Sequence, residues 1–148
     1  MGMLEASSKK FVAAFNRHDA DAVAEGYATS CVVHDPAYPA PLVGRSAVRQ
    51  DAATFFRAFP DLQIQSLERF EKGDLGSEEF RMTGTNTGPL AEPTGEIPAT
   101  GRPIDLKGAV IIRFDAQGLI QEERRYYDAG ALMRQLGLAP EPAAAATH

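Results

Sequence analysis

The stretch from Pro103 to Asp128 reads P-I-D-L-K-G-A-V-I-I-R-F-D-A-Q-G-L-I-Q-E-E-R-R-Y-Y-D, and it decides the fold. Two runs of strand character, at 103–114 and 119–128, flank the polar sequence Asp115-Ala116-Gln117-Gly118. Glycine at the end of such a turn adopts positive φ angles without steric cost. The stretch therefore predicts two antiparallel strands joined by a tight hairpin.

Strand patterns also precede this hairpin, where residues alternate with a period of two at 62–72 and 77–87. The segment from Gly88 to Pro103 is rich in proline and glycine, and it predicts a loop that shapes the rim of a cavity. After the hairpin, Ala129–Leu136 predicts a short helix that ends at Gly137.

The first half of the chain has helical periodicity. Ser7 or Ser8 is the expected cap of a first helix, and Asp19 is the expected cap of a second. Prolines end the third helix and a short strand before it. These elements are expected at 8–18, 21–27 and 45–59 for the helices and at 32–35 for the strand. Helices followed by strands indicate an α+β fold.

Length and charge limit the function classes. The 148 residues make one domain, with a core over residues 8–138 and a disordered tail over 140–148. A formal charge of −5 argues against nucleic-acid binding. The sequence has no apolar run long enough for a membrane span, so we expect a cytoplasmic location. The single cysteine, Cys31, excludes a disulfide framework, and no metal-ligand spacing is present, so no metal is expected.

Eight stretches together resemble the SnoaL-like polyketide cyclase family of the NTF2-like superfamily. They are F-V-A-A-F-N-R-H-D-A-D-A-V-A-E-G-Y (11–27), V-V-H-D-P (32–36), G-R-S-A-V-R-Q-D-A-A-T-F-F (44–56), F-P-D-L (59–62), G-T-N-T-G-P-L (84–90), P-A-T-G-R-P-I (98–104), R-F-D-A-Q-G-L-I-Q-E (113–122) and Y-Y-D-A-G-A-L-M-R-Q-L-G (126–137). The resemblance implies a cone-shaped, curved, mostly antiparallel sheet wrapped around three N-terminal helices, with a pocket inside and no cofactor.

Alternation along 119–128 separates the candidate catalytic side chains into two sets. We expect the even-numbered set to face the pocket, mainly because the acidic residue and the pocket aromatic of the family match Glu122 and Arg124. Burial of a carboxylate in an apolar pocket raises its pKa toward neutral pH, where general acid–base catalysis is efficient, so Glu122 is the first candidate. A structural ion pair of Glu122 with Arg124 or Arg113 is the alternative. Arg124 itself implies an anionic substrate group or an internal ion pair.

Further candidates surround this strand. His34 has a side chain suited to carrying protons, although a hydrogen-bonded strand-end histidine is the alternative. Asp128 is a third catalytic candidate, or else the N-cap of the last helix. The histidine that often accompanies the family's acid matches Gly108. Three side chains are expected to bind substrate, although core packing or a turn also explains them: Tyr126, Tyr38 and Asn86.

The hypothesis from the sequence is a cofactor-free cyclase-type lyase or isomerase acting on a small, hydrophobic, carbonyl-containing ring compound. Two alternatives are a ligand-binding protein without catalysis and a hydratase or epoxide hydrolase. The apolar residues on the outside of such a sheet also predict a homodimer.

Overall fold

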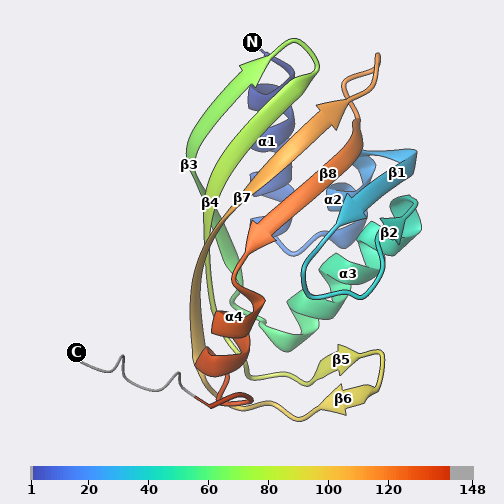
Figure 1. The fold of residues 1–148 in the computed structure, drawn as a ribbon. Helices are drawn as coiled ribbons and strands as arrows, with labels where there is room; N and C mark the ends of the chain where they lie inside the picture. Colours follow the sequence, from blue (N-terminus) through green and yellow to red (C-terminus); the bar gives the residue numbers. More distant parts are fainter. Residues whose placement is uncertain (1, 141–148) are drawn as a thin grey trace, which may run out of the picture.

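The computed structural model describes residues 2–140, and in it four helices and eight strands form one α+β unit (Figure 1). The helices are α1 (Met3–Asn16), α2 (Ala20–Glu25), α3 (Arg45–Ala58) and α4 (Ala129–Gln135). The strands are β1 (Tyr27–His34), β2 (Leu42–Val43), β3 (Gln63–Lys72), β4 (Leu75–Thr85), β5 (Leu90–Glu92), β6 (Gly95–Ile97), β7 (Pro103–Phe114) and β8 (Ile120–Tyr127).

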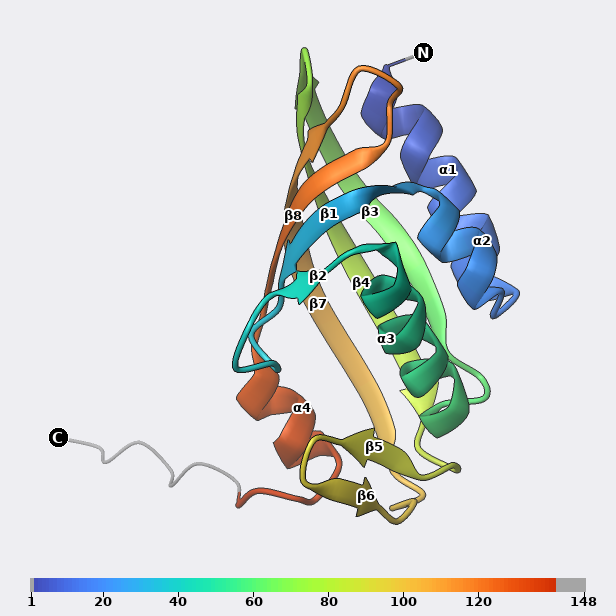
Figure 2. The ribbon, with the colours of Figure 1, turned by 90° about the vertical axis from the view of Figure 1, so that its right-hand side faces the viewer.

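Six of the strands form a curved sheet in the order β2-β1-β8-β7-β4-β3. All neighbours are antiparallel except β1 and β8, which are parallel. Helices α1, α2 and α3 lie on one side of this sheet, and the sheet bends toward them (Figure 2). The expected fold class, a curved sheet with N-terminal helices on its concave face, is confirmed.

The β7–β8 hairpin has the predicted bounds and turn. Asp115 accepts hydrogen bonds from the backbone N–H groups of Gln117 and Leu119, both at 2.9 Å. Gly118 has a φ of 78°, which a residue with a Cβ adopts only with strain. The turn residues therefore fix the register of β7 and β8, two neighbouring strands at the centre of the sheet.

Helix α1 begins at Met3, several residues before the expected caps Ser7 and Ser8. Its free N–H groups are satisfied from β3, because Glu71 accepts hydrogen bonds from the backbone N–H groups of Leu4 (3.3 Å) and Glu5 (3.2 Å). Ser8 is buried instead of capping the helix. A partner more than sixty residues away in sequence thus sets where this helix starts.

Two other elements differ from expectation. Asp19 caps α2 as predicted, but Tyr27 begins β1, which is longer than the expected strand because it pairs with β8. The proline-rich segment after Gly88 is not a plain loop, because it contains the β5–β6 hairpin.

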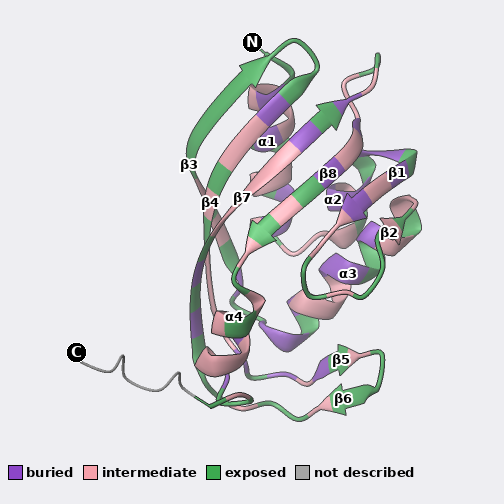
Figure 3. Cartoon of the chain, in the orientation of Figure 1, coloured by how far each residue is buried: buried purple, intermediate pink, exposed green. Residues whose placement is uncertain are grey.

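The core lies between the concave face of the sheet and the helices, and Figure 3 marks the buried residues along these strands and helices. Cys31 belongs to this core, as expected of a free thiol. Of the tail expected to be disordered, residues 141–148 lie outside the described residues. Within residues 2–140 no helix is long and apolar enough to cross a membrane.

Candidate active site

A cavity of about 120 Å³ lies on the concave side of the sheet, between the strands and helices α1 and α3. Most of its wall is apolar, so a ligand there is largely removed from water. The apolar lining side chains are Leu4, Phe11, Phe15, Val23, Val48, Ala52, Phe55, Ile64, Phe80, Met82, Ile104, Leu106, Val110, Ile112, Ile120 and Leu132. The polar ones are Ser7, Ser8, Asp35, Asp51, Glu78, Glu123, Arg125 and Tyr127.

From Glu123 to Tyr127 the odd-numbered side chains of β8 face this cavity, so the expectation that Glu122, Arg124 and Tyr126 point inward is wrong. The cause is the register of the hairpin. Ile112 pairs with Glu123 and Val110 pairs with Arg125, so even residues of β7 share a face with odd residues of β8. Because the apolar even-numbered side chains of β7 line the cavity, the odd-numbered side chains of β8 paired with them line it too. Ile120, also of the even-numbered set, does line the cavity, because the pairing with β7 shifts by a residue between Arg113 and Phe114.

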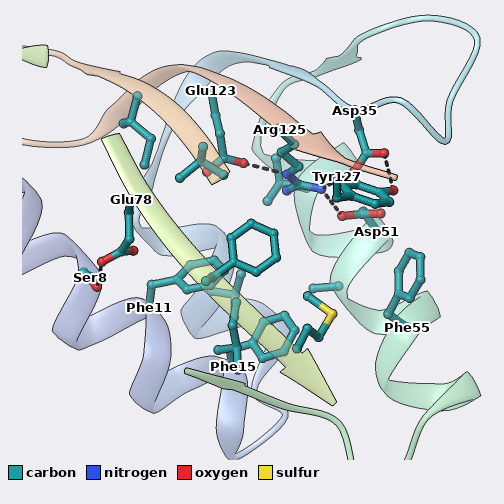
Figure 4. A pocket seen from close by; sticks show the side chains of 18 of the residues that line it. Ser8, Phe11, Phe15, Asp35, Asp51, Phe55, Glu78, Glu123, Arg125 and Tyr127 are labelled. Atoms are coloured by element: carbon teal, nitrogen blue, oxygen red, sulfur yellow. Dashed lines mark hydrogen bonds and ion pairs between the residues drawn. The ribbon is translucent and has the colours of Figure 1, made fainter. Parts of the chain in front are cut away.

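Arg125 is the centre of a polar cluster at one end of the cavity (Figure 4). Its Nε donates to Glu123 Oε2 at 2.7 Å, and its Nη1 donates to Asp51 Oδ2 at 2.8 Å and to Asp35 Oδ2 at 3.0 Å. The Arg125 side chain is 16% exposed, and the three carboxylates are 5–8% exposed. These four residues, Arg125, Glu123, Asp51 and Asp35, are called the Arg125 cluster below.

Three tyrosine hydroxyls donate to the carboxylates of this cluster, one to each. Tyr27 donates to Glu123 at 3.0 Å, Tyr127 to Asp35 at 2.7 Å and Tyr38 to Asp51 at 2.5 Å. Burial, and then the negative charge of the carboxylate that each contacts, raises the pKa of all three tyrosines above its usual value. The hydroxyls therefore stay protonated and act as donors at neutral pH.

Arg125 remains charged in this setting. Burial by itself lowers the pKa of a guanidinium, but the negative charges of Glu123, Asp51 and Asp35 raise the pKa of Arg125 above its usual range. Among the described residues its Nη2 has no hydrogen-bond partner, and no buried side-chain nitrogen or oxygen there lacks one. Nη2 is therefore an unpaired donor that is not fully buried.

The acid and the histidine favoured by sequence meet on the opposite face of the sheet. His34 Nε2 lies 3.7 Å from Glu122 Oε2, and Arg124 Nη1 lies 3.5 Å from Glu122 Oε1. All three side chains are 40–44% exposed. The structure therefore brings Glu122, His34 and Arg124 together as a solvent-exposed group outside the cavity, in the ion pair named as the alternative.

The other sequence candidates also lie away from the cavity, except for Tyr38, which reaches its edge through Asp51. Asp128 accepts the N–H of Ala131 at 2.9 Å as the N-cap of α4, and this bond lowers the pKa of Asp128. Tyr126 is 54% exposed on the outer face. Asn86 is buried and bonds only to backbone and side-chain groups of the protein.

The ring of Phe80 fills the space beside Gly108, the position that matches the family's histidine. Gly108 faces the cavity between Leu106 and Val110, and a Cβ there would lie 2.6 Å from Phe80 Cζ and 2.7 Å from the carbonyl oxygen of Tyr126. Phe80 is the cross-strand partner of Gly108, so its ring lies over the glycine. A larger residue at Gly108 would therefore displace that ring.

Sequence reasoning missed all four residues of the Arg125 cluster, and Tyr127 beside them. One signal was available, because Asp51 lies on the same helical face as Val48, Ala52 and Phe55, where an acid is out of place. For the β8 residues the deciding information is the hairpin register. Within the described residues, no three His, Cys, Asp or Glu side chains form a group that could hold a metal ion.

The curved sheet with helices on its concave face is similar to solved structures of the ketosteroid isomerase-like fold. One such protein, from Catenulispora acidiphila, superposes with a TM-score of 0.73 at 20% identity over 90% of this chain and 93% of that one. TsrD from Streptomyces laurentii superposes with a TM-score of 0.78 at 22% identity, covering 93% and 96%.

The family is set by sequence. The family model for SnoaL-like polyketide cyclases matches residues 6–136, so the chain belongs to the SnoaL-like polyketide cyclase family. IdmH from Streptomyces antibioticus, a candidate polyketide cyclase, shares 25% identity and a TM-score of 0.70, with 90% of this chain and 97% of that chain covered. The chain matches none of the curated proteins.

Proposed function

We propose that this protein is a cyclase-type acid–base enzyme that acts on a small, largely apolar carbonyl compound held in the cavity. The observation that carries the proposal is the buried Arg125 cluster, which places donors and carboxylates against an apolar wall. Membership of the SnoaL-like family and the similarity to IdmH support the same class of reaction.

Asp51 is the proposed acid–base group. Its two oxygens accept one hydrogen bond each, from Tyr38 and Arg125, so each retains a free lone pair. Asp35 is more occupied, because it also accepts the N–H of Ala37, and Glu123 accepts Tyr27 on both oxygens. Of the three carboxylates, Asp51 is also the most exposed, at 8%.

Proton transfer from a substrate carbon to Asp51 leaves the total charge at the site unchanged, because the negative charge moves from the carboxylate to the substrate oxygen. The Arg125 guanidinium contacts Asp51 and is the group proposed to stabilise that oxygen as well. The tyrosine donors hold the carboxylates in place while Asp51 gains and loses the proton.

Arg125 Nη2 is the proposed donor to the substrate oxygen. In this scheme Asp51 removes a proton from the carbon next to a carbonyl, and Nη2–H stabilises the enolate oxygen. The enolate carbon then attacks a second carbonyl of the same molecule, forming a carbon–carbon bond. The protonated Asp51 returns its proton to the new alkoxide, so the step is balanced without an oxidant or reductant.

The test is enolisation of a simple ring ketone. β-Tetralone in D₂O exchanges its α-protons for deuterium, and proton NMR follows the loss of signal with and without protein. Wild type should accelerate this exchange, and Asp51→Asn should slow it by about a hundredfold, a typical contribution of a positioned base. An Asp51→Asn rate equal to that of wild type would contradict the assignment.

Glu122→Gln is the matched control, because Glu122 is adjacent to Glu123 in sequence but lies on the outer face. It should change the exchange rate by less than about twofold, whereas Glu123→Gln, which removes a charge from the cluster, should lower it. A large loss in Glu122→Gln alone would restore the outer-face acid as the active group.

Ligand binding without turnover is the second candidate, and the full internal bonding of the Arg125 cluster favours it. Asp35 and Glu123 are already occupied by donors of the protein, as in a structural ion network. β-Tetralone that binds but exchanges no faster than in buffer, in wild type and Asp51→Asn alike, would support this candidate.

The homodimer stays a prediction. Tyr126, Phe70 and Leu75 are 54%, 66% and 40% exposed on strands of the main sheet, and a second copy would remove such apolar surface from water. Static light scattering should give twice the chain mass. A particle of 15.9 kDa would contradict the prediction.

A further inference from the structure

A second polar group, on the far side of the cavity from Arg125, consists of Glu78 on β4, Ser8 on α1 and Ser66 on β3. Ser8 Oγ donates to Glu78 Oε2 at 2.6 Å, and Ser66 Oγ donates to the same oxygen at 2.8 Å. Ser8 is 3% exposed and the Glu78 side chain is 12% exposed. Two hydroxyl donors therefore hold one nearly buried carboxylate in a fixed orientation.

The two oxygens of Glu78 are in different situations. Oε2 accepts both serine hydroxyls and lies 3.6 Å from Arg69 Nη1. Oε1 has no hydrogen-bond partner within residues 2–140, where no buried side-chain oxygen is without one. Oε1 is therefore an unpaired acceptor that is not fully buried, on a residue that lines the cavity.

The charge of the cavity wall selects against anions. Four carboxylates line it, those of Asp35, Asp51, Glu78 and Glu123. The guanidinium of Arg125 lines it too, and that of Arg69 lies 3.6 Å from Glu78. The charge of Arg125 is already shared among three carboxylates, so it does not offset the charge of a carboxylate or phosphate on a ligand. A further negative charge in this low-dielectric space is unfavourable, whereas a neutral or cationic molecule is accepted.

The two polar groups lie on opposite sides of the cavity, and aromatic side chains such as those of Phe11 and Phe15 lie along the wall beside them (Figure 4). The wall thus presents an acceptor at one end, Glu78 Oε1, and a donor at the other, Arg125 Nη2. A ligand that satisfies both has a hydrogen-bond donor and a carbonyl oxygen separated by an apolar body.

We propose that the cavity selects a neutral or cationic carbonyl compound whose far end donates a hydrogen bond, from a hydroxyl or ammonium group, to Glu78 Oε1. The inference uses the same cavity as the proposed function and therefore rests on it for the site, but it concerns which molecule enters, whether or not turnover follows. Glu78 binds substrate in this arrangement and takes no part in the proton transfer at the other end.

The test compares binding of three matched ketones to wild type by saturation-transfer NMR titration: para-hydroxybenzylacetone, benzylacetone and the para-carboxylate of benzylacetone. The hydroxyl compound should bind about tenfold more tightly than benzylacetone, because it adds one hydrogen bond to a charged acceptor. The carboxylate should bind most weakly. A para-aminomethyl analogue, which is an ammonium ion at neutral pH, distinguishes a cationic donor from a neutral one.

Glu78→Gln should reduce the preference for the hydroxyl compound to less than about threefold and improve binding of the carboxylate. Glu79→Gln is the control, because Glu79 is the next residue on β4 and is exposed, and it should leave all three affinities unchanged. If Glu78→Gln does not fold, the order of the three affinities in wild type still tests the proposal.

Equal affinities for the hydroxyl compound and benzylacetone, tighter binding of the carboxylate, or no binding of any ketone at millimolar concentration would each overturn the proposal. The β-tetralone exchange assay measures chemistry and this series measures recognition, so each can fail alone. Selective binding without exchange would leave this proposal standing and remove the acid–base function. Exchange without selectivity would do the reverse.

Discussion

Asn86 shows at the scale of one residue how a polar side chain in this protein supports the site without touching a ligand. Its Nδ2 donates to the carbonyl oxygens of Ala58 (3.1 Å) and Gly88 (2.9 Å), and its Oδ1 accepts from the backbone N–H of Thr100 (2.8 Å) and its hydroxyl (2.9 Å). All four hydrogen-bonding positions of the amide are filled. Asn86 therefore ties the end of α3 to the segment that carries β5 and β6.

Asn86→Ala should lower the free energy of unfolding by about 3 kcal/mol, because it removes the four hydrogen bonds that the buried amide makes to Ala58, Gly88 and Thr100. Urea unfolding followed by circular dichroism measures the loss. Thr87→Ala, at the adjacent exposed position, should change stability by less than about 0.5 kcal/mol. A similar small change in Asn86→Ala would show that water replaces the lost bonds.

At the scale of an element, α1 depends on β3 for its start. Glu71 accepts the N–H groups of Leu4 and Glu5, and a Cβ at Gly2 would overlap the Glu71 carboxylate. Glycine at this position thus leaves room for an acid of another strand at the positive end of the helix. Because Ser8 and Phe11 of the same helix line the cavity, the capping contact also fixes one wall of the site.

Glu71→Ala should reduce stability by about 1 kcal/mol, the usual cost of losing a helix cap, and should raise amide hydrogen exchange in the first turn of α1. Hydrogen exchange read by NMR localises the effect. Glu68→Ala, an exposed acid on the same strand, should leave exchange in α1 unchanged. Equal exchange rates in Glu71→Ala and wild type would contradict the capping role.

At the scale of the whole molecule, stability depends on the Arg125 cluster and its tyrosines, because elements from both halves of the chain contribute to them. Tyr27 and Asp35 come from β1 and the loop after it, Asp51 from α3, and Glu123 and Arg125 from β8. Ionisation of a tyrosine in this cluster would add a negative charge beside carboxylates, so the folded state holds these protons more tightly than the unfolded chain does.

Stability should therefore fall as pH rises above about 10. The pKa values of Tyr27, Tyr38 and Tyr127 are raised above the usual 10.0, so below that pH both states hold the protons and stability does not change. Above it the unfolded chain releases protons that the folded chain keeps, at about 1.4 kcal/mol per pH unit for each tyrosine.

Urea unfolding at pH values on either side of 10.0 measures this slope, and tyrosinate absorbance should rise together with unfolding. Tyr27→Phe removes one of the three groups, so its curve should be shallower than that of wild type. A wild-type curve that stays flat above this pH would show that the cluster opens and lets its tyrosines ionise in the folded state.

The sequence by itself determined the features that depend on local pattern. The helix periodicity at 45–59, the hairpin turn at Asp115–Gly118 and the Asp19 cap are local, and the structure has all three. The N-cap role of Asp128 is also local, because it depends only on the helix that directly follows this residue. The order of helices and strands was also enough to predict an α+β fold, whereas the curved sheet around N-terminal helices was implied by the resemblance to the SnoaL-like family.

Only the tertiary structure decided which side chains of β8 enter the cavity. Alternation separates Glu122 and Arg124 from Glu123 and Arg125, but a shift of one residue in the pairing with β7 exchanges the two sets completely. The same holds for Asp35 and Asp51, which meet Arg125 through contacts between segments distant in sequence. Pattern fixes the period of a strand, whereas the face it buries is set by its neighbours.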